Sequence, residues 1–331
     1  MIPKTSFTYK LDAGQQKELV KFLKEGNYRP VKMEYTIYAA ETPDCRIAMY
    51  TSGKCLIQGK GAPDFVSFIL EPCILKQVQL GYEDQLNPEL SSPHFGIDES
   101  GKGDFFGPMV IAGAYIDATL IDAMREMDVK DSKNITSDKK AIDMGRALRK
   151  LLGNRFTVIK IGPATYNNLY MKMRSVNNML AWGHARAIEN LLGVVPDCPK
   201  AISDQFGDAS LIRKALMQKG QKIELVQRHK AESDLAVAAA SILAREGFLM
   251  ALREMSDRFK VTIPKGASDR VKDVATDIAK KAGPNILVET VKCHFKTTDE
   301  VLSRIGSSRS ALPPQGRTFS RAFTYKRPEK K

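Results

Sequence analysis

Residues 96–108 read GIDESGKGDFFGP, and this stretch decides both the fold class and the chemistry. Asp98 and Glu99 follow the apolar residues Phe95 and Ile97 at the end of an expected strand. Unpaired charge is costly at a buried strand end, so an acidic pair in this place favours a functional site over a solvated turn. Neighbouring side chains on a strand point to opposite faces, and we therefore expect the glycines that follow to let the chain turn at Glu99.

The segments around this motif alternate between strand and helix. Strands are expected at 94–99, 108–117, 155–162, 200–206 and 222–229, and helices at about 138–152, 165–192, 208–219 and 233–256. The Ala-rich run from Leu235 to Ala244 predicts a helix that packs closely on the sheet. This order predicts an α/β domain over residues 94–306, with a mixed sheet and helices on its faces.

A smaller module precedes this domain. Residues 12–26 have helical apolar spacing, three strand-like runs follow at 33–41, 45–53 and 54–60, and Pro63 opens a second apolar helix. We expect an α+β domain over residues 1–82, a polar linker with two prolines over 83–93, and a basic, disordered tail over 307–331.

Composition limits the classes of protein. The 331 residues carry a net charge of +13, which favours an anionic partner such as nucleic acid. Residues 1–90 hold as many acidic as basic side chains, whereas residues 307–331 hold seven basic and one acidic. The five cysteines form no CxxC pair, which argues against a disulfide framework and against a zinc site. The N-terminus has no apolar signal core and the longest apolar run is short, so we expect a cytoplasmic protein with no membrane contact.

Further acidic residues stand where strands end or helices begin. Asp204 ends the expected strand AISD, and carboxylates from the ends of different strands can meet in space. Glu232 and Asp234 flank the start of the Ala-rich helix, where either residue would also serve as a cap. Asp204 has a similar structural alternative as a cap of the helix near Asp208.

A set of three or four carboxylates is typical of a metal site. Hard divalent cations such as Mg²⁺ take oxygen ligands, and two such ions can activate a water and stabilise the leaving oxygen at phosphorus. The four histidines show no local ligand spacing, and we interpret His184 as a helix-packing residue. Residues 96–103 approach a phosphate-binding loop, but Gly103 replaces the hydroxyl residue that holds Mg²⁺, which excludes a nucleotide hydrolase.

Several motifs together resemble the bacterial ribonuclease HIII family, a type 2 ribonuclease H. The motifs that carry the resemblance are GIDESGKGDFFGP (96–108), DVKDSKNIT (128–136), SDQFG (203–207), KAESDLAVAAASILAR (230–245), VKCHFK (291–296) and the long helical stretch 166–192. The stretch YTSGKCLIQGKGA (50–62) is similar to the family's N-terminal substrate-binding module, which resembles half of a TATA-binding protein. The resemblance covers roughly residues 1–305.

This resemblance implies a ribonuclease H fold and cleavage of the RNA strand of RNA–DNA hybrids, leaving 5′-phosphate and 3′-hydroxyl ends. It places Asp98, Glu99 and Asp204 at metal-ligand positions for Mg²⁺ or Mn²⁺, with two ions when substrate is bound. The fourth acid falls on Glu232, although one residue fewer than expected separates it from Ala240-Ser241, so Asp234 stays an alternative.

The resemblance also suggests substrate contacts. They are the glycine turn Gly101-Lys102-Gly103, whose main chain would reach 2′-hydroxyls, Ser132 and Lys133 in the motif near the active site, and Lys54 and Lys60 as a basic face of the N-terminal module. We expect a monomer that needs no protein partner. Two other hypotheses stay open: another metal nuclease of the same fold that cuts DNA, and a binding module without catalysis.

Overall fold

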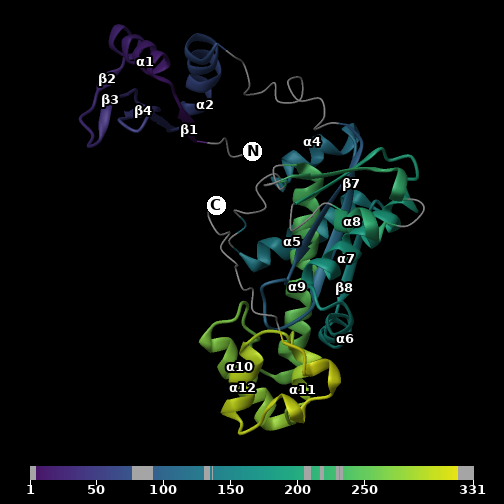
Figure 1. The fold of residues 1–331 in the computed structure, drawn as a ribbon. Helices are drawn as coiled ribbons and strands as arrows, with labels where there is room; N and C mark the ends of the chain where they lie inside the picture. The colour runs from purple at the N-terminus through teal and green to yellow at the C-terminus, as the bar shows by residue number, and fades with distance from the viewer. Residues whose placement is uncertain are drawn as a thin grey trace, which may run out of the picture. The chain divides into compact units, whose positions relative to one another are not determined.

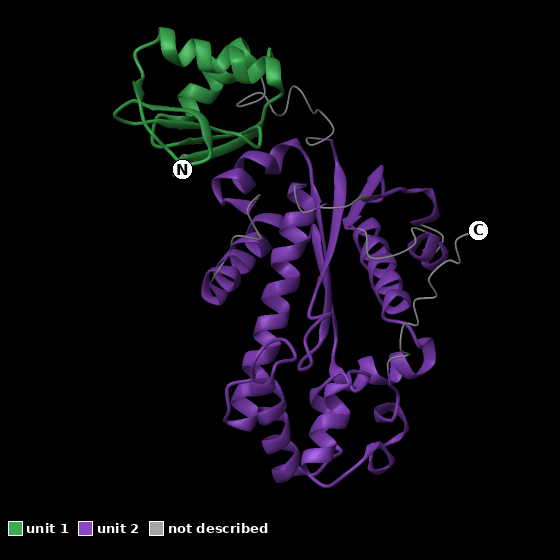
Figure 2. Cartoon of the chain, turned by 60° about the vertical axis from the view of Figure 1, so that its left-hand side comes forward, with its two compact units in different colours: residues 1–90 green, residues 91–331 purple. Residues whose placement is uncertain are grey.

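The computed structural model describes residues 5–76, 92–129, 135, 137–204, 210–216, 220–228, 231 and 234–319. The chain forms two compact units, residues 1–90 and 91–331 (Figure 2). Most of the expected linker, residues 83–91, lies outside the described residues, so the extent of the linker stays a prediction.

The first unit is an antiparallel sheet covered by helices. Its strands lie in the order β1-β5-β4-β3-β2, with bounds β1 Ser6–Lys10, β2 Arg29–Pro30, β3 Thr36–Glu41, β4 Arg46–Tyr50 and β5 Lys54–Gln58. Helix α1 (Ala13–Glu25), helix α2 (Ala62–Phe65) and the π-helical segment η1 (Val66–Leu75) supply the apolar side chains that pack on the buried strand residues.

Local sequence explains most of this unit. Asp12 accepts hydrogen bonds from the amides of Gly14 and Gln15 and forms a capping box with Gln15. The helix ends before Gly26, close to the end of the predicted range 12–26. Gly53 has a φ of 81° in the turn between β4 and β5, a conformation that glycine adopts without strain. The short strands β1 and β2 were not predicted, and β1 matters because it completes the sheet beside β5.

The second unit is built around a mixed five-stranded sheet. Its order is β10-β9-β6-β7-β8, in which β6, β7 and β8 pair antiparallel and β9 and β10 run parallel to β6. The bounds are β6 His94–Ser100, β7 Met109–Ile116, β8 Phe156–Ile161, β9 Lys200–Asp204 and β10 Glu224–Arg228. All five strands were predicted, each to within about two residues at either end.

Helices cover both faces of this sheet (Figure 1). One layer contains α4 (Ala118–Glu126), α5 (Asp138–Leu152) and α9 (Leu235–Phe259), and the other contains α6 (Pro163–Met173), α7 (Val176–Leu192) and α8 (Ser210–Ala215). The 3₁₀ turn η4 (Gly220–Lys222) precedes β10. Beyond α9 the chain forms α10 (Asp269–Ala282), α11 (Ile286–Thr290) and α12 (Thr297–Arg304), which gather at the C-terminal end of α9.

Helix α9 packs directly on the sheet, as its alanines predicted. A Cβ atom placed on Gly96 of β6 would lie 2.1 Å from main-chain atoms of Ala236 and Val237, so strand and helix meet backbone to backbone. By length and composition α9 is apolar enough to cross a membrane, but 78% of its most apolar window is buried inside the protein. This burial is that of a core helix.

Two expectations differ from the structure. The single helix expected over 165–192 is two helices, because Arg174 adopts a left-handed conformation and Ser175 then caps α7 by accepting from the amide of Asn178. The disordered tail expected from residue 307 is wrong for residues 307–319. They form 3₁₀ turns at Arg309–Ala311 and Pro314–Gly316, and Arg309 donates to the carbonyls of Cys293 and Thr318. Residues 320–331 lie outside the described residues.

Candidate active site

Asp98 lies near the C-terminal end of β6, and Asp204 ends the neighbouring parallel strand β9. Strands β6 and β9 pair with Ile97 opposite Ser203, and the next residue along each strand is Asp98 or Asp204. Paired strands lie about 4.8 Å apart, so this register brings the two carboxylates side by side. Side chains alternate along a strand, and because Ile202 of β9 packs in a cluster with α9, Asp204 faces α9 as well.

The surroundings of Asp98 disfavour its charge. Burial raises the pKa of Asp98 to about 6, and the nearby charge of Glu99 adds to the rise. The hydroxyl of Ser241 on α9 and the main-chain amide of Glu99, which donates to Oδ1 at 2.8 Å, oppose the shift. A carboxylate held in this way gains stability when a cation arrives beside it.

Glu99 points to the other face of the sheet. Strand β6 continues to Ser100, which pairs with Val110, so the chain does not turn at Glu99 as we expected. Its Oε2 lies 3.1 Å from Nε2 of His184 on α7, and its Oε1 lies 3.8 Å from Nζ of Lys102. Burial would raise the pKa of Glu99, but the hydrogen bond and charge of His184, together with Lys102, outweigh it and hold the pKa below its usual value.

The contact between His184 and Glu99 was not predicted from the sequence, which indicated only a packing role for His184. His184 is fully buried on α7, as the packing interpretation required, but it also contacts one of the candidate metal ligands. The signal available in the sequence was a histidine within the helical motif shared with the family, without any spacing to link it to Glu99.

The glycine turn follows β6. Gly101 has a φ of 85°, and a Cβ there would lie 2.4 Å from the carbonyl oxygen of Pro108, so this position needs glycine. A Cβ on Gly103 would meet no atom within 4 Å, which leaves the main chain at Gly103 open to a ligand. Lys102 lies between them and reaches toward Glu99.

A buried lysine holds the loop after the turn. Nζ of Lys292 donates to the carbonyls of Asp104 and Gly107, each at 2.8 Å, and to that of Phe106 at 3.3 Å. Burial lowers the pKa of Lys292 to about 7. Lys292 belongs to the VKCHFK motif, but neither its burial nor its partners, far earlier in the chain, can be read from the sequence.

Asp234 caps α9. Its Oδ1 accepts hydrogen bonds from the amides of Ala236 and Val237, and its Oδ2 lies 3.0 Å from Nε2 of the buried His94. These contacts already use the Asp234 carboxylate, so they support the capping interpretation. Glu232 lies outside the described residues.

We expect Glu232→Gln to lower turnover at saturating substrate by roughly 100-fold, and Asp234→Asn mainly to lower the melting temperature. Asparagine can still cap a helix but loses the charge that faces His94. Steady-state cleavage and thermal unfolding of both variants separate the two roles. A larger loss of turnover in Asp234→Asn than in Glu232→Gln would make Asp234 the fourth acid.

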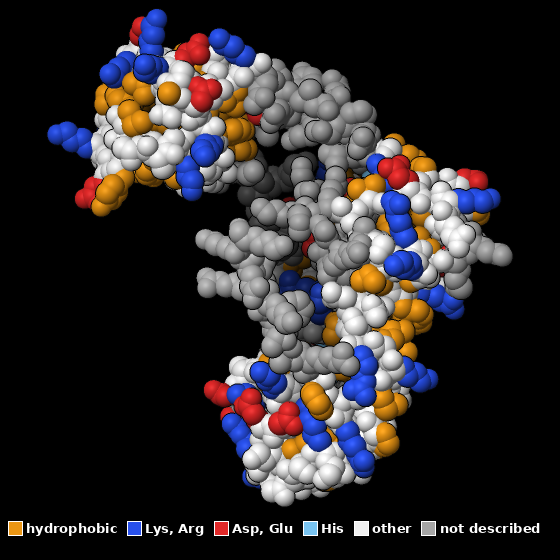
Figure 3. Space-filling model, in the orientation of Figure 1, with side chains coloured by type: hydrophobic (Ala, Val, Ile, Leu, Met, Phe, Trp, Pro, Cys, Tyr) orange, Lys and Arg blue, Asp and Glu red, His pale blue; other side chains and the backbone are white. Residues whose placement is uncertain are grey.

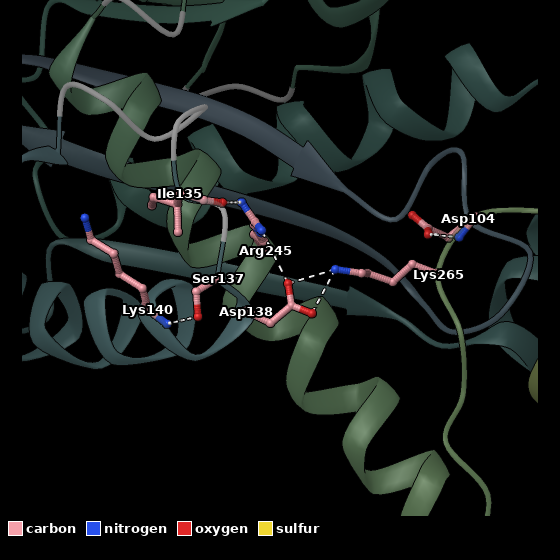
Figure 4. A network of polar contacts seen from close by, with 8 residues as sticks. Asp104, Ile135, Ser137, Asp138, Lys140, Arg245 and Lys265 are labelled. Atoms are coloured by element: carbon pink, nitrogen blue, oxygen red, sulfur yellow. Dashed lines mark hydrogen bonds and ion pairs between the residues drawn. The ribbon is translucent and has the colours of Figure 1, made fainter.

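A network of hydrogen bonds and ion pairs holds Ile135 and Asp138, which follow residues 130–134 (Figure 4). Lys265 binds both carboxylate oxygens of Asp138 at 2.8 Å, and Arg245 of α9 bridges Asp138 and the carbonyl oxygen of Ile135. Next to Lys265, the amide of Gly266 donates to Asp104 Oδ1. The network thus joins α5, α9 and the loop beyond the glycine turn. The candidate contacts Ser132 and Lys133 lie outside the described residues.

Lys54 and Lys60, the expected basic face of the first unit, lie at opposite ends of β5. Lys54 begins β5 and lies opposite Lys10 of β1, whereas Lys60 follows the other end of β5. Six residues of strand span about 20 Å, so the two lysines do not form one cluster. Lys60 instead lines a hollow of about 940 Å³ together with Arg29 and Arg46. The pairing of Lys10 with Lys54 was not anticipated.

The acids fit a metal site only in part. Among the described residues, no three His, Cys, Asp or Glu side chains converge closely enough to hold an ion. Asp98 and Asp204 supply two adjacent oxygen donors, while Glu99 faces α7 and Glu232 falls outside the described ranges. Hard oxygen donors of this kind suit Mg²⁺ or Mn²⁺.

The sheet order, with three antiparallel strands followed by two parallel ones, and the acids at neighbouring strand ends define a ribonuclease H-like fold. The family model for ribonuclease HII matches residues 95–298, and a model described as a domain of unknown function (DUF3378) matches residues 6–77. The chain belongs to the ribonuclease HII family and, within it, groups with ribonuclease HIII over most of its length.

The relatives support this grouping. Ribonuclease HIII of Protochlamydia amoebophila (strain UWE25) is 39% identical over 300 residues, which is 91% of this chain and 98% of the relative. Ribonuclease HIII of Chlamydia pneumoniae is 40% identical over 300 residues, with 90% and 98% covered. The crystal structure of Bst-RNase HIII in complex with Mn²⁺ is 25% identical, covers 90% of this chain and 98% of that chain, and gives a TM-score of 0.62.

Proposed function

We propose that this protein hydrolyses the RNA strand of RNA–DNA hybrids with divalent metal ions held by Asp98, Glu99 and Asp204. The observation that carries the proposal is the register of β6 and β9, which sets Asp98 beside Asp204 on one face of the sheet. Two adjacent carboxylates, one of them with a raised pKa, form a site that a cation stabilises. The relatives named ribonuclease HIII and the Mn²⁺ complex of one of them support the same activity.

Each residue has a role in this proposal. Asp98 and Asp204 bind metal directly, and Glu99 is the third proposed ligand, although in this structure its carboxylate faces α7, where His184 keeps it ionised. Glu232 is the fourth acid. Ala231, the residue before it, donates its amide to Oδ1 of Asp204 at 3.3 Å, which ties this part of the chain to the acid pair.

The metal supplies Lewis-acid stabilisation of the phosphate and an attacking water of lowered pKa, and two ions would serve the entering and leaving oxygens. Attack of water at phosphorus with departure of the 3′-oxygen leaves a 5′-phosphate and a 3′-hydroxyl. The main chain at Gly101-Lys102-Gly103 would read the 2′-hydroxyls, which distinguish RNA from DNA. Since all four acids come from one chain, we propose that the protein acts as a monomer. We also propose that it acts in the cytoplasm.

Cleavage of four matched, labelled duplexes tests this function: RNA–DNA, RNA–RNA, DNA–DNA, and DNA with a single ribonucleotide, each with Mg²⁺ or Mn²⁺. We expect cutting only of the RNA strand in the RNA–DNA hybrid, with no cutting when the metal is chelated. Cleavage of the DNA duplex would instead support a different nuclease on the same fold. Efficient cutting at the single ribonucleotide would change the proposed specificity.

A further inference from the structure

A hollow with several charged side chains at its wall lies in the second unit, away from the carboxylates. It measures about 510 Å³ and is formed by the C-terminal half of α9, the segment after it and the start of α10. We call it the α9–α10 groove. Its charged lining consists of Arg253, Lys265, Arg270 and one acid, Asp138. Figure 3 shows Lys and Arg side chains, interspersed with fewer Asp and Glu, over the lower part of this unit.

The positive charge of the groove is not neutralised from within. Asp138 already binds Lys265 and Arg245, so its single negative charge is shared between two cations (Figure 4). Among the described residues, neither Arg253 nor Arg270 has an ion-pair partner or a side-chain hydrogen bond. Two exposed guanidinium groups beside one hollow therefore lack an anion.

The start of α10 adds donors to the same place. Ser268 precedes this 14-residue helix and lines the groove, but its side chain makes no capping hydrogen bond. The first amides of a helix carry partial positive charge and bind anions readily when a side-chain cap is missing. Asp269 in the first turn is itself held by Lys272 at 3.0 Å.

We propose that the α9–α10 groove binds a backbone phosphate of the substrate duplex, with Arg253 and Arg270 as its direct contacts. This inference rests on the function proposed above. Guanidinium groups match phosphate in shape as well as charge. Ser241, which bonds Asp98, and Arg253 are both on α9, twelve residues and so about 18 Å apart. The groove therefore lies several nucleotides away from the reacting phosphate.

Hybrid binding as a function of salt tests the groove. Binding would be measured in the cleavage-deficient Asp98→Asn protein, with and without Arg253→Ala and Arg270→Ala together. Each phosphate contact contributes about 0.9 to the slope of log affinity against log salt. Because both arginines contact one phosphate, we expect the double variant to lower that slope by about one and to bind about tenfold more weakly at low salt.

A matched control separates the groove from net charge. Lys280 and Lys281 are exposed at the far end of α10, about 15 Å from Arg270, and Lys280→Ala with Lys281→Ala removes the same two charges. This control should keep most of the slope, and Arg253→Lys with Arg270→Lys should restore most of it to the groove. An unchanged slope in the arginine variant, or an equal loss in both double variants, would overturn the groove assignment. Failure of the Asp98→Asn parent itself to bind hybrid would instead contradict the proposed function.

Discussion

Asp98→Asn should lower turnover on an RNA–DNA hybrid by roughly 100-fold or more while leaving hybrid affinity nearly unchanged. Asp98 and Asp204 are adjacent donors, and removal of one charge leaves the site unable to hold metal during the reaction. The substrate contacts lie on other residues, so binding does not depend on this charge. Single-turnover cleavage and equilibrium binding measure the two effects separately. Full activity in Asp98→Asn would contradict the metal assignment.

The same substitution should raise stability in the absence of metal. The pKa of Asp98 is raised to about 6, so between its ordinary value and pH 6 the folded protein binds more protons than the unfolded chain. The stabilising effect of this group is therefore present at low pH and is lost as pH rises through about 6. One pKa unit corresponds to about 1.4 kcal/mol, which allows a gain of up to about 3 kcal/mol for the Asp98→Asn variant above pH 6.

Denaturant unfolding of both proteins in the presence of a chelator, at pH 4 and at pH 7.5, shows whether the Asp98→Asn variant is more or less stable than the parent. The stability difference should be small at pH 4 and should favour the variant at pH 7.5. A variant that is less stable than the parent at pH 7.5 would show that loss of activity came from damage to the fold. Added Mg²⁺ or Mn²⁺ should stabilise only the parent protein.

Gly96→Ala should be the most destabilising single change in the second unit. The added Cβ would lie 2.1 Å from the main chain of both Ala236 and Val237, so α9 would have to move away from β6 and lose its close packing on the sheet. We expect a loss of roughly 4 kcal/mol or more in the free energy of unfolding, beyond the usual range for overpacking. Chemical denaturation of the purified variant measures it.

Gly162→Ala provides the matched control. Gly162 precedes α6 with a φ of −60°, and a Cβ there would meet no atom within 4 Å. Its stability should change by less than about 1 kcal/mol. If both glycine variants unfold at the same denaturant concentration as the parent, the direct contact between β6 and α9 is not as close as the structure places it.

The sequence predicted those parts of the site that depend on local sequence patterns. Asp98 and Asp204 each follow a strand signal, and acids at strand ends were expected to meet, which the register of β6 and β9 allows. Glu99 was expected to share that face after a turn, yet β6 keeps its pairing to Ser100 and directs Glu99 toward His184. Which face a side chain takes depends on the partner strand, and no local pattern contains that information.

The fold shows the same division. The apolar spacing of residues 12–26 and the alanines of α9 are local signals, and they predicted their helices. The ordered segment 307–319 was missed because its polar composition resembles a tail, whereas its position depends on the hydrogen bonds from Arg309 to the carbonyls of Cys293 and Phe295, which precede the segment. Together with the burial of Leu312 in the core, the hydrogen bonds of Arg309 hold a segment whose overall composition is polar.

The pairing of β6 with β9 also has a consequence for synthesis of the chain. More than one hundred residues separate Asp98 from Asp204, and the two acids meet only when β9 has docked beside β6. Helix α9, whose main chain closes on Gly96, emerges from the ribosome later still. A nascent chain therefore carries an incomplete acid set until most of the second unit has been made. Non-local assembly of this kind is slow, and it delays the appearance of nuclease activity until both β9 and α9 have been made.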